Sequence, residues 1–382
     1  MKRKLFSPEH EAFRDTVAAF VAAELVPFHA EWEKQQRVPR EVWAKAGAAG
    51  LLCPDIPEEY GGYGADWLCN VVVIEELAKQ GMSGPGFMVH SEMVAPYIRA
   101  WGSEELKRKW LPRMVTGEAI GAVAMTEPGA GSDLKELRTR AVRDGDRYVI
   151  NGQKTYISNG QNCDFILLAC KTDPSAGARG VSIIFVEADT PGFERGRNLE
   201  KIGLKAQDTS ELFFSDMRVP AGNLLGEEGK GFSMLMAKLS HERLTQAVRS
   251  ACVCEAAIDW TVDYTRERKA FGGTIADFQN TQFVLAQLSA ETTSARVFTD
   301  QCIADHLLGE LGPIDAAKVK LVVTDLHNKV VNECLQFFGG YGYMIEYPIA
   351  RAFIDARITR IAGGAAEVMK QIIARDLFSR NS

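Results

Sequence analysis

The sequence predicts an α+β fold built from three consecutive parts, and the spacing of its apolar residues is the evidence. Up to about residue 120, apolar residues recur with the period of amphipathic helices. Residues 121–230 break into short β-rich runs separated by Gly-containing turns, and residues 231–382 return to long helical patterns. We therefore expect an N-terminal helical domain (1–120), a central β-barrel-like domain (121–230) and a C-terminal four-helix bundle (231–382).

The N-terminal part carries recognisable helix starts. Ser7 is suited to cap a helix, and Pro8 fits the first helical position because its φ angle is already fixed. Ser103 is a second predicted cap, followed by two acidic residues in the first turn, where the helix dipole favours them. The pattern predicts helices from residue 7, from residue 39, and over 67–79, 93–101 and 103–115.

The middle part is predicted to be a series of short strands. Runs rich in β-branched and aromatic residues are separated by the turn dipeptides Asp144-Gly145, Asn151-Gly152 and Asn159-Gly160. The predicted strands cover residues 140–142, 148–151, 155–158, 165–171, 181–187 and 211–214. The C-terminal part shows four long helical patterns, at about 232–265, 276–308, 315–338 and 349–378, which predict a bundle.

Composition excludes several classes of function. The apolar content of 46% and charged content of 25% are those of a soluble globular protein. The net charge of -6 gives no electrostatic reason to expect nucleic acid or an anionic membrane as a partner. The eight cysteines include no CxxC pair, and no His falls at metal-ligand spacing, so we expect reduced thiols and no metal site.

The N-terminal residues do not have the pattern of an export signal. The basic residues at positions 2–4 lead directly into a helix start at Ser7 rather than into an apolar signal core. No run approaches the ~18 consecutive apolar residues that a membrane-spanning helix needs. We therefore expect a cytoplasmic protein without a membrane anchor.

The stretch 123–133, Val-Ala-Met-Thr-Glu-Pro-Gly-Ala-Gly-Ser-Asp, is the first candidate site. It ends a predicted strand, and its glycines leave room for a ligand to approach the main chain. Ser132 and Asp133 add polar groups beside free N–H donors, which suits a flat, polar-edged ring or an anion. Its spacing matches neither the Rossmann nor the Walker pattern, so taken alone a plain Gly-rich turn is the better interpretation.

Three further stretches carry similar signals. Tyr156-Ile-Ser at a strand end offers an aromatic face and hydroxyl groups, although core packing explains it equally well. Arg268 and Lys269 are adjacent cations that suit a phosphate, or else a solvated helix end. Residues 336–343, Gln-Phe-Phe-Gly-Gly-Tyr-Gly-Tyr, end a long helix with glycines that permit close backbone contact.

In this order, and on a helical–β–helical frame, these motifs resemble the acyl-CoA dehydrogenase family over essentially the whole chain. The matching stretches are residues 126–133, Gly-Leu-Lys-Ala-Gln-Asp-Thr at 203–209, Glu-Arg-Lys-Ala-Phe-Gly at 267–272, and 336–340 with Tyr347-Pro348. The resemblance implies FAD, and a homotetramer in which Arg268, Gln279 and residues 336–340 reach the FAD of a neighbouring subunit. The FAD-binding residues that it implies are Val123, Ala124, Met125, Thr126, Gly131, Ser132, Tyr156, Ile157, Ser158, Arg268, Phe271, Gln279, Gln336, Phe337, Gly339, Gly340, Ala365 and Glu367.

The reaction that the resemblance implies is α,β-dehydrogenation of an acyl-CoA thioester to a trans-2-enoyl-CoA. A carboxylate removes the α-proton while hydride passes from the β-carbon to flavin N5. An electron-transfer flavoprotein is the implied acceptor. Flavin oxidases and monooxygenases share the fold, and a non-catalytic flavin- or acyl-CoA-binding relative is a further alternative.

The position of the catalytic carboxylate distinguishes branches of the family. Most members carry this Glu near the C-terminus, where this chain has Gly363. The chain is then either a catalytically dead relative or similar to the long-chain and isovaleryl branches, whose base lies on the first long C-terminal helix. Glu242, followed by Arg243, occupies the place of that Glu-Arg pair and continues an apolar stripe. We favour Glu242 as the base over the alternative of a solvated surface pair.

The resemblance also implies the surroundings of the base. A backbone N–H near Gly363 or Gly364 and a flavin hydroxyl would bind the thioester oxygen, Arg243 would orient Glu242 or the thioester, and Ser132 would lie near the acyl-CoA. Relatives usually have Thr after the loop glycine, but this chain has Ala365 and Ala366. We therefore expect a roomier pocket for a medium, long or branched acyl chain, and a weaker hold on the FAD phosphates.

Overall fold

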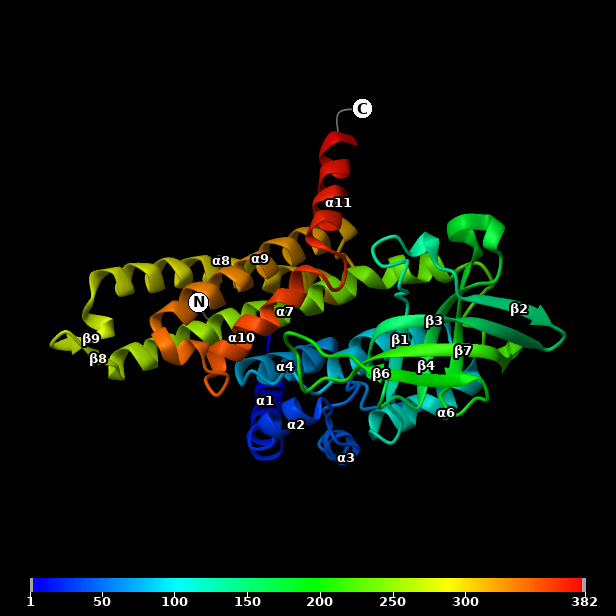
Figure 1. Cartoon of the computed structure of the whole chain (residues 1–382), viewed down its shortest axis with the longest axis horizontal. Helices are drawn as coiled ribbons and strands as arrows, with labels where there is room; N and C mark the ends of the chain where they lie inside the picture. Colours follow the sequence, from blue (N-terminus) through cyan, green and yellow to red (C-terminus); the bar gives the residue numbers. More distant parts are fainter. Residues whose placement is uncertain (1–2, 380–382) are drawn as a thin grey trace.

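The computed structural model describes residues 3–379, and its three parts follow the predicted order (Figure 1). The β-rich part lies at one end of the molecule, the long C-terminal helices extend away from it, and the first helices pack along one side. The predicted α+β fold class is therefore confirmed. In the described part of the chain, none of the helices has both the length and the apolar character needed to cross a membrane.

The N-terminal helices form largely where their sequence signals predict. Ser103 caps its helix, since its Oγ accepts a hydrogen bond from the N–H of Leu106 at 3.3 Å. The helix predicted over 93–101 differs at its start, because a π-helical turn, η3 (Val89–Val94), leads into it. The helices are α1 (Pro8–Phe20), α2 (His29–Gln35), α3 (Arg40–Ala48), α4 (Trp67–Lys79), α5 (Ala95–Trp101) and α6 (Glu104–Val115).

The central part is one curled sheet in the order β1-β4-β2-β3-β7-β6, with β5 paired to β4. Apolar side chains on its inner face, including Tyr148, Ile150 and Leu168, are fully buried and form the core of this part. The strands are β1 (Gly121–Ala124), β2 (Arg140–Asp144), β3 (Arg147–Ser158), β4 (Phe165–Lys171), β5 (Val181–Glu187), β6 (Phe193–Asn198) and β7 (Thr209–Pro220).

Two local predictions in this sheet were wrong. Asn151-Gly152 is not a turn, because β3 continues through it with a register shift between Ile150 and Gly152. Gly152 has φ +152°, and a Cβ there would lie 2.7 Å from Thr139 Cα, so the glycine serves close strand packing. Strand β6 was not predicted, because its charged, largely exposed sequence lacks apolar alternation.

The C-terminal part contains the predicted bundle, with one correction. The pattern at 349–378 is not one helix, since the chain breaks between α10 and α11 where Gly363 and Gly364 have φ of +67° and +98°. As a result α11 projects away from the bundle (Figure 1). The helices are α7 (Gly231–Glu267), α8 (Gln279–Leu307), α9 (Pro313–Phe337), α10 (Pro348–Ala356) and α11 (Ala366–Ser379), and a short hairpin, β8 (Lys269–Ala270) and β9 (Gly273–Thr274), joins α7 to α8.

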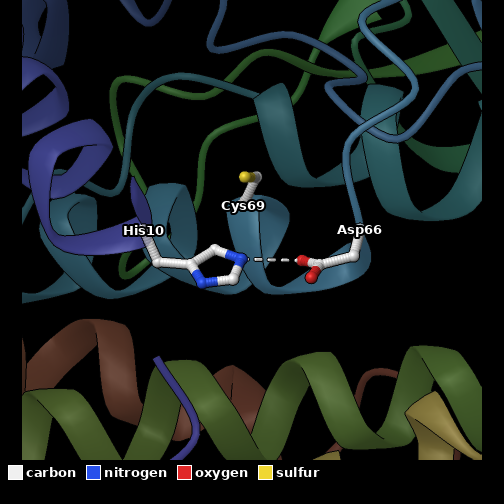
Figure 2. Close-up of side chains that lie close together, drawn as sticks. All are labelled: His10, Asp66 and Cys69. Atoms are coloured by element: carbon white, nitrogen blue, oxygen red, sulfur yellow. Dashed lines mark hydrogen bonds and ion pairs between the residues drawn. The ribbon is translucent and has the colours of Figure 1, made fainter. Parts of the chain in front are cut away.

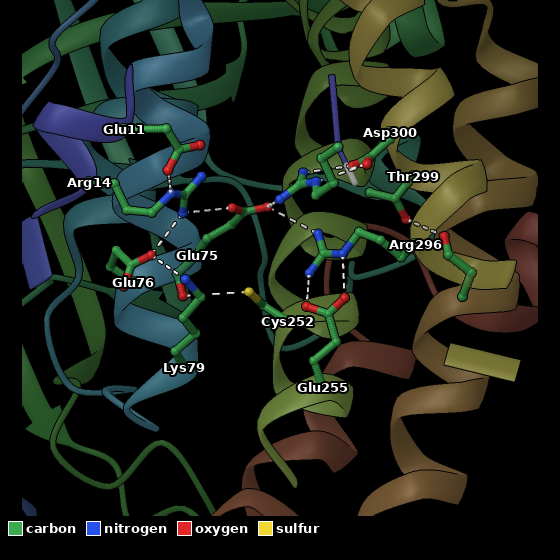
Figure 3. Close-up of polar contacts among 12 residues, drawn as sticks. Glu11, Arg14, Glu75, Glu76, Lys79, Cys252, Glu255, Arg296, Thr299 and Asp300 are labelled. Atoms are coloured by element: carbon green, nitrogen blue, oxygen red, sulfur yellow. Dashed lines mark hydrogen bonds and ion pairs between the residues drawn. The ribbon is translucent and has the colours of Figure 1, made fainter. Parts of the chain in front are cut away.

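A buried ion network ties the N-terminal helices to the bundle (Figure 3). Glu75 of α4, whose side chain is 1% exposed, contacts the guanidinium groups of Arg3, Arg14 and Arg296 at 2.7, 2.9 and 3.0 Å. Arg296 of α8 also contacts Glu255 of α7 at 2.6 Å. Burial acts to raise the pKa of Glu75, but the arginines hold it below its usual value, so the carboxylate stays ionised. Four helices are thereby fixed against one another.

Candidate active site

The turn after β1 is held in place by a buried ion pair. Lys154 of β3 is fully buried, and its Nζ donates to the Met125 carbonyl and to Glu127 Oε1, both at 2.8 Å. Glu127 also accepts the backbone N–H groups of Arg138 and Thr139 at 2.6 and 3.0 Å. The strand end and its turn are therefore fixed beside β3 rather than left as a loose loop.

The outer surface of this turn is open. A Cβ added at Gly131 would meet no atom within 4 Å, and Ser132 is exposed. Tyr156 is 68% exposed and has φ +60°, an uncommon conformation for an aromatic residue. Val123, Met125, Thr126 and Ser158 are half-buried, whereas the side chains of Ala124 and Ile157 are buried in the core. The structure thus brings exposed hydroxyl and backbone groups together at an open turn.

Glu242 lies in α7 with its side chain in the protein interior. The residue is 2% exposed, and its Oε1 accepts a hydrogen bond from the Tyr97 hydroxyl of α5 at 3.2 Å. Burial raises the pKa of the Glu242 carboxyl, and the charge of His241, the Tyr97 hydrogen bond and the charge of Arg243 act against that rise. A surface position for this residue, the alternative considered from the sequence, does not agree with this burial.

A small apolar pocket adjoins this carboxyl group. It is narrow, and Tyr97, which donates to Glu242, forms part of its wall. Strand β1 contributes Val123 to the same wall, and Met125 directly after the strand adds to it. The pocket residues are Tyr97, Val123, Met125, Leu167, Ala169, Ile183 and Leu235. The buried carboxyl group, an apolar pocket and the open turn are therefore neighbours.

The loop before α11 packs against α7 close to the carboxyl group. Arg243 is 5% exposed, and its Nε has no hydrogen-bond partner among the described residues. A Cβ added at Gly364 would lie 3.9 Å from Arg243 Nη2, and a Cβ added at Gly363 would lie 3.7 Å from Gln246 Cγ. Lys320 of α9 donates from Nζ to the Gly364 carbonyl at 2.6 Å, and burial lowers its pKa to about 8. Ala365 is half-buried and Glu367 is exposed directly beyond this loop.

The other predicted cofactor residues lie at the far end of α7. This helix has 37 residues, so it is roughly 55 Å long at 1.5 Å per residue. Glu242 lies in its first third, whereas Arg268 follows its last residue, with its guanidinium 5.4 Å from the Tyr341 ring centroid. The hydroxyl of Tyr264 donates to the Phe338 carbonyl at 3.3 Å. This distal group contains Arg268, Phe271, Gln279, Gln336, Phe337, Gly339 and Gly340, and Phe271 is 96% exposed.

Comparison with known proteins identifies the family. Three family models, described as the N-terminal, middle and C-terminal domains of acyl-CoA dehydrogenase, match residues 7–118, 122–217 and 229–378. The chain belongs to the acyl-CoA dehydrogenase family. Together with the relatives described next, these matches show an acyl-CoA dehydrogenase enzyme close to the long-chain branch, in a family of flavoproteins.

The similarity to individual relatives spans the whole chain. The long-chain specific acyl-CoA dehydrogenase, mitochondrial, of Mus musculus is 46% identical over 99% of this chain and 88% of the relative. A crystal structure of an acyl-CoA dehydrogenase from Geobacillus kaustophilus has 48% identity and a TM-score of 0.96, covering 98% of this chain and all of that one. A structure titled as the electron transferring flavoprotein of Acidaminococcus fermentans has 34% identity and a TM-score of 0.94, covering 99% of both chains.

Two residues of this candidate site were not predicted from the sequence. Tyr97 lies in an apolar helical pattern, and nothing in that pattern distinguishes it from a core aromatic residue. Lys320 resembles any cation on a long helix. Each residue belongs to the candidate site through a contact with a segment far away in the sequence, so no local pattern identifies it.

Replacement of Tyr97 by phenylalanine should lower the rate of the reaction about tenfold. The change keeps the ring but removes the hydroxyl that donates to Glu242, and a hydrogen bond to a charged group contributes roughly 1.5 kcal/mol or more. Rapid-mixing measurement of flavin reduction by acyl-CoA would test this. An unchanged reduction rate would show that the hydroxyl does not hold the carboxylate.

A surface group of possible metal ligands has another explanation (Figure 2). His10 Nε2 lies 2.9 Å from Asp66 Oδ1, and its Nδ1 accepts the N–H of Ser7 at 3.0 Å. Asp66 also caps α4 by accepting the N–H of Leu68 at 2.9 Å. The Cys69 sulfur lies within 4.8 Å of the His10 and Asp66 ligand atoms, and burial raises the pKa of its thiol to about 11. These groups serve to cap helices, and we assign no metal to them.

Proposed function

We propose that this enzyme converts an acyl-CoA to a trans-2-enoyl-CoA, with Glu242 taking the proton from the α-carbon. The observation that supports this most is the position of its buried carboxyl group, held by Tyr97 at the edge of an apolar pocket. Burial raises the pKa of Glu242, which makes its carboxylate a stronger base for a weakly acidic carbon. The apolar side chains that line this pocket would contact the acyl chain and exclude water from the carboxylate.

The thioester oxygen needs hydrogen-bond donors where negative charge develops as the proton leaves. Gly363 and Gly364 can supply a backbone N–H without a side chain that competes for space. Lys320 fixes this loop through the Gly364 carbonyl. Arg243 adds a buried guanidinium whose Nε is free for an acceptor, so we propose that it orients the thioester or Glu242. Ser132, exposed on the turn, would contact the acyl-CoA from the other side.

The residues of the turn fit a flavin. Exposed Tyr156 and the open backbone at Gly131 offer a flat surface for an aromatic ring, and Thr126, Ser132 and Ser158 offer hydroxyl groups to its polar edge. We propose FAD as the cofactor of this chain. When bound, it would supply the acceptor for the hydrogen that leaves the β-carbon as hydride. Ala365 and Ala366 offer no hydroxyl group to its phosphates, which supports a weaker hold on them.

The distal group supports a homotetramer. Arg268, Gln279, Gln336, Phe337, Gly339 and Gly340 are exposed or half-buried and lie together, but α7 separates them from the turn by most of its length. One chain cannot present both groups to one dinucleotide. We propose that the distal group serves the FAD of a neighbouring subunit, with Arg268 as a phosphate partner.

We propose medium, long or branched acyl chains as substrates. The pocket wall is apolar apart from the Tyr97 hydroxyl, and the loop that packs against Arg243 carries small residues at 362–366. We expect anaerobic bleaching of the bound flavin to be faster with branched or medium-to-long acyl-CoAs than with short straight ones. Rates across a panel matched in concentration would show this. A strict preference for short straight chains would contradict the proposed pocket.

We propose an electron-transfer flavoprotein as the acceptor, as membership of the acyl-CoA dehydrogenase family implies. An oxidase of the same fold is the competing function. During turnover in air, we expect hydrogen peroxide to form at only a small fraction of the rate at which enoyl-CoA forms with an electron-transfer flavoprotein present. Peroxide formation equal to enoyl-CoA formation would favour the oxidase.

A further inference from the structure

A chain of three ionisable residues lies beside the proposed base and has no part in the mechanism above. Glu92 of η3 is 3% exposed, and its Oε2 lies 3.0 Å from His241 Nε2. On the other side of the same ring, His241 Nδ1 lies 3.1 Å from Nε2 of His306, at the end of α8. Both imidazole rings pack against Trp67, with ring centroids 5.2 and 4.5 Å away. The chain therefore joins three elements around α7.

The hydrogen bonds among Glu92, His241 and His306 indicate which of their atoms carry protons. Burial acts to raise the pKa of Glu92, but His241, Trp67 and Asn70 donate to it and keep the pKa below its usual value. A carboxylate only accepts, so His241 Nε2 carries a proton. Burial lowers the pKa of His306 to about 4, so His306 is neutral near pH 7 and its Nε2 is able to accept from a protonated His241. A protonated His241 thus has partners for both of its N–H groups.

The buried carboxylate of Glu92 also favours this positive charge. A buried charge is costly unless it is paired, and among the described residues His241 is the side chain that pairs with Glu92 when protonated. Glu242 follows His241 directly in α7, and the His241 charge is the largest influence that opposes the effect of burial on its pKa. The other charged or titratable groups around the two residues are Tyr97 and Arg99 of α5, Asp55, and Lys238 and Arg243 of α7.

We propose that His241 is a positioning residue of the reaction: held between Glu92 and His306, it keeps a positive charge beside Glu242 and sets the pH below which that base is protonated. This inference rests on the proposed role of Glu242. The sign follows from the charge, since a neighbouring cation stabilises the carboxylate and its loss makes the carboxylate easier to protonate.

The test is the pH dependence of flavin reduction by a saturating acyl-CoA in the holoenzyme. His241→Gln keeps a donor for Glu92 but removes the charge. We expect the acid limb of the profile to move to higher pH by about one unit, because a nearby opposite charge shifts a pKa by about 1–3. The rate below the limb then falls about tenfold, while the high-pH plateau stays within about twofold of wild type. His10→Gln, the same change in a helix cap, should leave the limb in place.

A second pair of variants tests the same inference in case the His241→Gln variant does not fold. His306→Phe removes the acceptor for His241 Nδ1–H and should move the acid limb to higher pH. His306→Gln keeps an acceptor oxygen and should leave the limb at the wild-type position. A uniform loss of rate with an unmoved limb in His241→Gln and His306→Phe would overturn the inference. If Glu242→Gln turned over normally, the proposed base itself would fail; if it were inactive and the limb unmoved, only the role of His241 would fail.

Discussion

Replacement of Glu242 by glutamine should lower the rate of flavin reduction by about 10²–10⁴-fold, the range that general base catalysis supplies. The amide has nearly the same shape as the carboxylate but cannot accept the α-proton. Glu242 is buried and contacts Tyr97 rather than the open turn, so the bound flavin should be retained. Anaerobic mixing with acyl-CoA would measure the rate, and the absorbance of the purified protein would report the flavin content.

The control for this change is Glu41→Gln, which makes the same substitution on the exposed first turn of α3. Its reduction rate should match wild type. Since glutamine at 242 still accepts a hydrogen bond from Tyr97, binding of acyl-CoA should persist, and the loss should fall on the chemical step rather than on affinity. Full activity of Glu242→Gln would exclude this carboxylate as the base.

Replacement of Lys154 by methionine should lower the free energy of unfolding by about 3–5 kcal/mol, the usual cost of removing one member of a buried ion pair. Lys154 is fully buried, and its loss leaves Glu127 without its counter-charge and the Met125 carbonyl without its donor. Both groups belong to the turn that would carry the flavin. We therefore expect a loss of flavin as well, measured alongside denaturant unfolding.

A double variant distinguishes the effect of the lost ion pair from the effect of the changed side-chain volume. In the double variant Glu127→Gln with Lys154→Met no unpaired charge remains, so part of the lost stability should return. Lys34→Met, at an exposed position of α2, should change stability by no more than about 0.5 kcal/mol. If Lys154→Met were as stable as wild type, the ion pair would not be what fixes the turn.

Local sequence signals determined most of the elements. Helix α4 has the predicted bounds, and Ser103 caps α6, because apolar period and capping act within a few residues. The errors arose where a partner decides the conformation. Gly152 looked like a turn residue, but pairing of β3 with its neighbours keeps it inside a strand. Strand β6 is an edge whose pairing with β7 replaces the apolar pattern it lacks.

The sequence by itself determined the family and its motifs, because each motif is a short run whose residue types and order carry the signal. Tertiary structure decided which motifs meet. Tyr97 and Glu242, 145 residues apart, share a hydrogen bond, and Lys320 of α9 donates to Gly364, 44 residues away. Neither contact can be predicted from the spacing of residues in the sequence, because each forms only when separate segments pack together. The same packing separates Arg268 from the turn along α7, which a list of motifs could not show.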